Sequence, residues 1–192
     1  MGLRGSALRF CVSDNAANML AAIPKHTKKI DVGLGCIDHL LNLIVKATNK
    51  IPEVEDALKE CKDLSGRVHH TPLDQQRIKR ECFHLHNDST VEVDCKYRKI
   101  ITAVDTRWNS SLFMAKSIHL LRPALESIGE GRFDDLEKTD PKLKNLIPSP
   151  TSFQVLEQVI PIMEKVLMLS EVLSGDKKPT IQHVRYFQVF IS

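Results

Sequence analysis

The first residue whose position suggests chemistry is an aspartate at the end of a short strand. Leu8, Phe10 and Val12 alternate with Arg, Cys and Ser, which is the period-two pattern of a pleated strand. Asp14 follows this strand directly, and residues 16–23 favour helix. An acid at the carboxyl end of a strand can hold a metal ion or ligand in an open α/β fold. It can equally cap the helix, so both interpretations stay open for Asp14 alone.

A second candidate is the Cys36-x-x-His39 pair, because a thiolate and an imidazole close in sequence can bind zinc. The residues that could complete such a site are Cys61, His69, His70, Cys82, His84 and His86. Cys82 and His86 would share one face of a helix. Structural zinc usually has two close ligand pairs, however, and no second C-x-x-C or H-x-x-x-H occurs. The spacing therefore does not predict a metal site.

The single tryptophan, Trp108, lies beside Arg107 where we expect a helix to begin. A tryptophan at a helix start usually anchors a hydrophobic core. We keep this interpretation for Trp108 beside the one that the family resemblance described below implies.

The sequence pattern around these candidate residues predicts a strand, a helix and a second strand, followed by a largely helical chain. Two glycines and a weak alternation predict a second strand or extended link that ends near Cys36. Helices are expected over residues 36–45, 52–64, 71–84, 110–129 and 152–173. The first of them is apolar on most of its circumference, which predicts a buried helix. The expected fold class is mainly α with a short N-terminal α/β piece.

Composition excludes several classes of protein. The net charge of the 192 residues is only +3, so electrostatics alone do not indicate a nucleic-acid binder. Five scattered cysteines suit reduced thiols in the cytosol or nucleus better than a disulfide framework. No apolar stretch approaches the roughly 20 residues that span a bilayer, so no membrane association is expected.

Three segments, in this order, resemble motifs of the hAT superfamily of DNA transposases and of the BED-zinc-finger proteins derived from them. The segment around Asp14 resembles the second catalytic-aspartate segment, Cys36 to Leu43 resembles the C-x-x-H helix, and Asp105 to Ser110 resembles the Arg-Trp segment. The resemblance covers nearly the whole chain. It implies a partial RNase H-like core over residues 1–36. Residues 37–192 would then be a large helical insertion, truncated at its C-terminus.

The resemblance also implies roles for these residues. In such transposases three acids bind two Mg²⁺ or Mn²⁺ ions, and Asp14 matches the second acid. The other two acids would lie before residue 1 and beyond residue 192, so this chain is expected to need no cofactor and to cut no DNA. Arg107 and Trp108 would stabilise a base swung out of the duplex. Cys36 and His39 would pack beneath the active site.

The leading hypothesis is therefore an inactive, transposase-derived nuclear protein that associates with DNA or with other proteins in transcriptional regulation; without the resemblance, a cytoplasmic location would be expected. A homodimer is expected only of a full-length relative. The second hypothesis is part of an active hAT transposase, in which Asp14 coordinates metal once the flanking acids are restored. The third is an unrelated helical scaffold.

Overall fold

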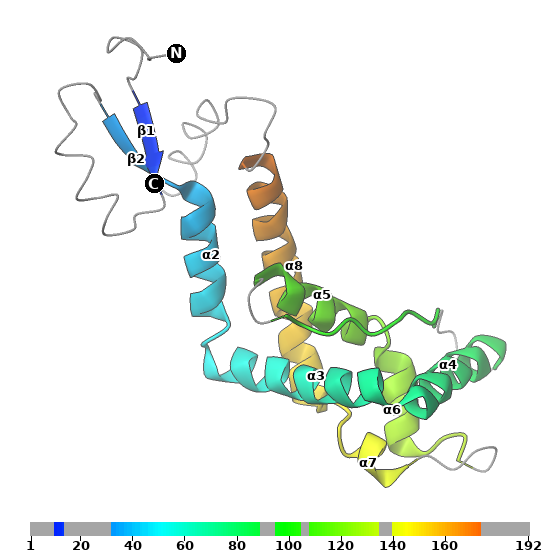
Figure 1. Cartoon of the computed structure of the whole chain (residues 1–192). Helices are drawn as coiled ribbons and strands as arrows, with labels where there is room; N and C mark the ends of the chain where they lie inside the picture. Colours follow the sequence, from blue (N-terminus) through cyan, green and yellow to red (C-terminus); the bar gives the residue numbers. More distant parts are fainter. Residues whose placement is uncertain (1–9, 14–31, 89–94, 105–107, 135–139, 174–192) are drawn as a thin grey trace. The chain divides into compact units, whose positions relative to one another are not determined.

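The computed structural model describes residues 10–13, 32–88, 95–104, 108–134 and 140–173. These residues are mainly helical, as the sequence predicts, with two strands near the amino terminus (Figure 1). The elements in chain order are β1 (Phe10–Ser13), β2 (Val32–Gly35), α2 (Ile37–Thr48), α3 (Pro52–His70), α4 (Pro72–Asn87), α5 (Trp108–His119), α6 (Arg122–Glu130), α7 (Pro141–Lys144) and α8 (Pro150–Leu173).

The two strands pair in parallel, with Phe10 opposite Val32 and Ser13 opposite Gly35. Both strands were expected from the sequence, and both are confirmed. Parallel neighbours need a crossover of roughly a dozen residues or more, which residues 14–31 are long enough to provide. The helix expected at residues 16–23 lies in that stretch, outside the described residues.

The chain folds into two compact units. One unit is Val45–Leu167, which we call the helical unit. The other takes in the described residues up to Ile44 and those from Met168 onward. Along the chain, the helical unit is thus inserted between two parts of the other unit.

The core of the helical unit is built from apolar side chains at three- and four-residue spacing. The buried face of α3 includes Val54, Cys61, Leu64 and Val68, close to the face that the sequence pattern predicts. This helix packs against α4 and α5, and α4 packs against α6. The largest fully buried side chains are Phe153, Leu64, Ile78, Leu112, Met114, Ile118, Leu121, Leu125, Ile128, Leu143, Leu156 and Met163.

The prediction for α8 is confirmed in both position and orientation. The helix begins at Pro150, two residues before the expected start at Ser152, and is described as far as Leu173. The three- and four-residue spacing predicts an inward face of eight side chains. Five of them are buried, namely Phe153, Leu156, Val159, Ile160 and Met163, and the other three, Val166, Leu167 and Leu169, are half-buried. Pro161 lies inside the helix, and its ring is on the exposed side.

The helix α2 is less buried than its composition predicts. Leu41 and Val45 are buried, but Leu40, Leu43 and Ile44 are 46%, 46% and 52% exposed. Apolar residues occupy more of this helix than the single stripe that it buries. The expectation of a helix buried all round is therefore wrong.

The single helix expected over residues 110–129 is in fact two helices. The first, α5, ends at His119, and Leu121 leaves the helical conformation (φ −96°, ψ 4°) before α6 begins. Pro123 explains the break, because it has no amide to donate to the carbonyl four residues earlier and restricts the residue before it. The expected stop after Gly129 is confirmed: Gly131 takes a left-handed conformation (φ 72°) that terminates α6.

Candidate functional site

The residues singled out from the sequence are only partly within the described chain. Asp14 and Arg107 lie outside the described residues. Trp108 is the first residue of α5, but its side chain is among those not described. Cys36 and His39 lie where β2 passes into α2, and both side chains are half-buried. The Cys36 carbonyl accepts the amide of Leu40 at 3.2 Å, so the C-x-x-H segment begins the helix.

Some of the proposed zinc partners have ordinary structural surroundings. Cys61 is fully buried in the core, and burial raises the pKa of its thiol to about 12. His69 and His70, at the end of α3, are exposed and contact each other edge to face. His84 lies 5.2 Å from the Phe133 ring, centroid to centroid. Within the described ranges, no three His, Cys, Asp or Glu side chains are arranged to hold a metal ion.

The remaining pair, Cys82 and His86, does share one face of α4 and lines a surface cavity of about 480 Å³. The opposite wall comes from the start of the extended segment 95–104, which leads from α4 toward α5 (Figure 1). The side chains around this cavity, which we call the α4 cavity, are Lys79, Cys82, Phe83, His86, Cys95, Lys96 and Tyr97.

The extended segment 95–104, whose first residues line the α4 cavity, makes side-chain hydrogen bonds to α5 nearer its other end. The Ile101 amide donates to Ser117 Oγ at 3.0 Å. Ser110 Oγ accepts the amide of Val104 at 2.9 Å and donates to its carbonyl at 2.7 Å. These bonds satisfy backbone groups that have no strand partner, so a segment without secondary structure can still present a defined surface.

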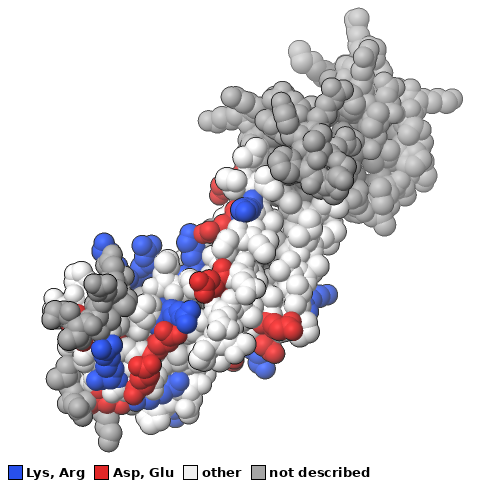
Figure 2. Space-filling view, turned by 180° about the vertical axis from the view of Figure 1, so that it is seen from behind, with Lys and Arg blue, Asp and Glu red and all other residues white. Residues whose placement is uncertain are grey.

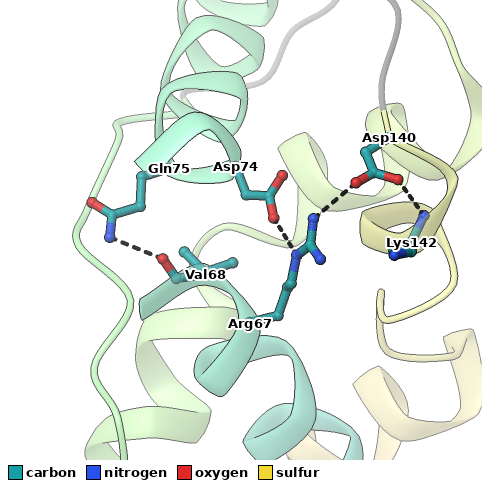
Figure 3. A network of polar contacts seen from close by, with 6 residues as sticks. All are labelled: Arg67, Val68, Asp74, Gln75, Asp140 and Lys142. Carbon is teal, nitrogen blue, oxygen red and sulfur yellow. Dashed lines mark hydrogen bonds and ion pairs between the residues drawn. The ribbon is translucent and has the colours of Figure 1, made fainter. Parts of the chain in front are cut away.

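A polar network at the α3–α4 corner orients the other wall (Figure 3). Arg67 Nε donates to Asp74 at 2.7 Å and its Nη2 donates to Asp140 at 2.8 Å. The hydrogen bond to Asp74 raises the pKa of the Arg67 guanidinium. Gln75 Nε2 donates to the Val68 carbonyl at 2.9 Å, which satisfies a carbonyl in the last turn of α3. The corner thereby fixes the direction in which α4 leaves α3.

A buried ionic cluster ties α4 to α6 and to the residues around α7. Arg77 Nη2 lies 3.2 Å from Glu81 Oε2 and 3.7 Å from Asp134 Oδ1. Ser127 Oγ, on α6, donates to Glu81 Oε1 at 2.5 Å. Lys144 pairs with Asp134. Glu81 is fully buried and Arg77 is 5% exposed, so this cluster supports α4 from its inner side rather than offering a surface for a ligand.

The α4 cavity combines groups that recognise phosphate and groups that stack. Lys79 and Lys96 are exposed cations, and Phe83 is 65% exposed. Tyr97 is half-buried in the opposite wall. Ammonium groups neutralise phosphates, and aromatic rings stack on bases regardless of sequence. The chemistry of the cavity therefore suits a nucleic-acid strand.

Sequence reasoning placed the nucleic-acid contacts at Arg107 and Trp108 and did not identify this cavity. The sequence feature that could have indicated the α4 cavity is the run Cys-Lys-Tyr-Arg-Lys at residues 95–99, in which basic residues surround an aromatic one. Lys79, on the neighbouring helix, comes next to this run only through packing.

The surface charge is mixed rather than concentrated. On the face seen in Figure 2, Lys and Arg side chains are interspersed with Asp and Glu. This agrees with the small net charge of +3. Any attraction for an anionic partner must therefore be local.

Comparison of the chain with protein-family models, with curated proteins and with solved structures gave no match. Among the described residues, no helix combines the length and the apolar character needed to cross a bilayer.

Proposed function

We propose that the chain derives from an hAT-type transposase and associates with DNA in the nucleus without cutting it. In this proposal β1 and β2 belong to an RNase H-like core, and the helical unit is an insertion into that core. The observation that carries the proposal is the order of the two units. One unit runs to Ile44, the helical unit spans Val45–Leu167, and the residues from Met168 onward belong to the first unit again.

The positions of the motif residues support the same origin. Asp14 directly follows β1, and Cys36-x-x-His39 joins β2 to α2. The resemblance implies a strand, a helix and a further strand over residues 1–36, and the parallel pairing of β1 with β2 is compatible with that order. Trp108 begins a helix, in keeping with the Arg-Trp segment of the resemblance.

The proposal assigns no cutting activity to these residues. Two divalent ions that flank one phosphate need several carboxylates, because Mg²⁺ prefers near-octahedral oxygen ligation. Asp14 is the one acid in the chain that the resemblance matches. No group of three or more acids, His or Cys suited to a metal occurs in the described ranges. Asp14 by itself supplies fewer carboxylate ligands than a two-ion centre needs.

The α4 cavity is the surface that we assign to DNA. Lys79 and Lys96 would neutralise backbone phosphates, and the exposed ring of Phe83 would stack on an accessible base. The Arg67 network holds the α3–α4 corner, and the bonds from Ser110 and Ser117 hold the far end of the segment that supplies the opposite wall. Preformed walls reduce the entropy lost on binding.

The test is fluorescence anisotropy with labelled duplex DNA, measured over a range of salt concentrations. Each lost phosphate contact lowers the slope of log K against log[salt] by about 0.9 on duplex DNA. The double variant Lys79→Ala/Lys96→Ala should therefore lower that slope by about 1.8. The matched control is Lys59→Ala/Lys165→Ala, which removes the same charge from exposed positions on α3 and α8. If the two double variants gave equal slopes of log K against log[salt], the α4 cavity would not be the DNA-binding surface.

A second arm tests the role of Trp108 and the absence of cutting. Trp108→Ala should weaken binding to DNA with one unpaired base by about tenfold, because stacking contributes about 1–3 kcal/mol per base. Trp108→Phe retains a ring and should bind nearly as well. Nicking that requires Mg²⁺ and disappears in Asp14→Asn would instead favour an active transposase. If the wild-type chain binds no DNA at all, DNA association is wrong and protein interaction becomes the better explanation.

A further inference from the structure

Two cysteine thiols lie next to each other at the base of the α4 cavity. Cys95 Sγ donates a hydrogen bond to Cys82 Sγ across a distance of 3.2 Å. One sulfur belongs to α4 and the other to the start of the segment 95–104. Both residues are almost fully buried, at 2% and 3% exposure, and both are free thiols. Neither thiol takes part in the proposed DNA contacts.

The geometry is close to that of a disulfide. The S–S bond is about 2.05 Å long, so the two sulfur atoms need to approach each other by roughly 1.1 Å from their present separation. Both residues line the cavity, which connects them to solvent. Lys79 and Lys96 on the same lining would attract the carboxylates of a small anionic peptide such as glutathione.

We propose that Cys82 and Cys95 form a thiol–disulfide exchange site whose co-substrate is a low-molecular-weight disulfide. One protein thiolate attacks a sulfur of oxidised glutathione, and the first glutathione leaves. The second protein thiolate then attacks the protein-side sulfur of the mixed disulfide, and the second glutathione leaves. The two protein thiols are oxidised to one disulfide, oxidised glutathione is reduced to two thiols, and the two protons pass to them. This site does not depend on DNA binding or on transposase ancestry.

The surroundings of the pair determine how it reacts. Burial raises the pKa of the Cys82 thiol, and the hydrogen bond from Cys95 adds to this effect. A thiol with a raised pKa contains little thiolate at neutral pH, so the first attack is slow. A disulfide is strongly oxidising when the protein stabilises the thiolate that its reduction produces. Burial does not stabilise the thiolate of Cys82, so the Cys82–Cys95 disulfide should be a weak oxidant. We therefore expect slow closure and a disulfide that persists once formed.

The experiment uses the whole 192-residue chain. It is incubated with excess oxidised glutathione, quenched by alkylation, and mapped by peptide mass spectrometry. The expected product is one linkage between the Cys82 and Cys95 peptides. Closing a loop of this length should raise Tm by roughly 6–12 °C. Cys36→Ser is the matched control, because it removes a half-buried thiol outside the cavity and should leave the linkage unchanged.

Two results would overturn the proposal. One is a stable glutathione adduct on Cys82 or Cys95 that never closes. The other is a pair that stays reduced under conditions that modify Cys36. Because the linkage is mapped in the wild-type chain, the test does not require Cys82→Ser or Cys95→Ser to fold. Where those variants do fold, the rise in Tm should be absent from both.

Discussion

Replacing Glu81 with glutamine should destabilise the helical unit, because the buried Arg77 guanidinium then loses the charge of a carboxylate 3.2 Å away. Glu81→Gln keeps an oxygen that can accept the hydrogen bond from Ser127, so the variant changes the charge more than the shape. The pair is 3.2 Å apart, with Glu81 fully buried and Arg77 5% exposed.

The magnitude follows from what remains around Arg77. Removing one partner of a buried ion pair destabilises a protein by about 3–5 kcal/mol. Asp134 still lies 3.7 Å from Arg77, and its side chain is 29% exposed, so it compensates in part. We therefore expect a loss near the lower limit, about 3 kcal/mol. For a chain of this size that corresponds to a decrease in Tm of roughly 6–12 °C.

The assay is urea unfolding followed by far-UV circular dichroism. Glu55→Gln is the matched control, since Glu55 is exposed on α3 and should change stability by less than about 0.5 kcal/mol. Arg77→Met and the double variant complete a double-mutant cycle. The double variant should be more stable than Glu81→Gln alone, because no buried charge is left without its counterion.

Two outcomes would refute this reasoning. One is a loss for Glu81→Gln no larger than that for Glu55→Gln. The other is strict additivity in the cycle, which would mean that Arg77 and Glu81 do not interact energetically despite their separation.

Two further predictions concern backbone conformation and pH. Gly131→Ala should destabilise by about 1–2 kcal/mol, since its φ is +72° and a Cβ would lie 2.8 Å from Asp134 Oδ2. Gly66→Ala lies inside α3 with open space around it and should stabilise the protein by about 0.5–1 kcal/mol in the same urea assay. The two alanine variants should therefore change the free energy of unfolding in opposite directions, and a change in the same direction would contradict the prediction. The Lys142 amide lowers the pKa of Asp140, helped by the charge of Arg67. The resulting stability is present above the ordinary pKa of about 3.9 and is lost as pH falls through the lowered pKa. The urea midpoint should thus decrease from pH 5 to pH 3 more in the wild type than in Asp140→Asn, and parallel decreases would contradict this origin.

Local patterns predicted the strands and most of the helices for a definable reason. The strand at Phe10–Ser13 follows from alternation, and the buried faces of α3 and α8 follow from three- and four-residue spacing. Gly131 terminates α6 because it adopts positive φ without a steric penalty. The break at Leu121 was also encoded locally, in Pro123, but the apolar periodicity on both sides of it concealed it.

The candidate site was far less predictable. Cys36 and His39 were recognised from their spacing, and they do join β2 to α2. Cys82 and Cys95, by contrast, had no distinguishing spacing, and Lys79 resembled any other solvated lysine. The apolar circumference of α2 led to the wrong prediction that this helix is buried on all sides. Composition indicates how much apolar surface a helix can bury, but not how much of that surface the neighbouring elements cover.

The sequence by itself determined most of the elements of this protein: the two strands, most of the helices after them, and the faces that α3 and α8 bury. Each of these depends on residues a few positions apart, whose geometry is set by backbone sterics and by helical or strand periodicity. Only the tertiary structure decided which thiols meet at 3.2 Å, which carboxylate accompanies Arg77 into the core, and which lysines border the α4 cavity. Those contacts depend on how whole helices pack against one another, and helix packing places residues together that have no periodic relation in the chain.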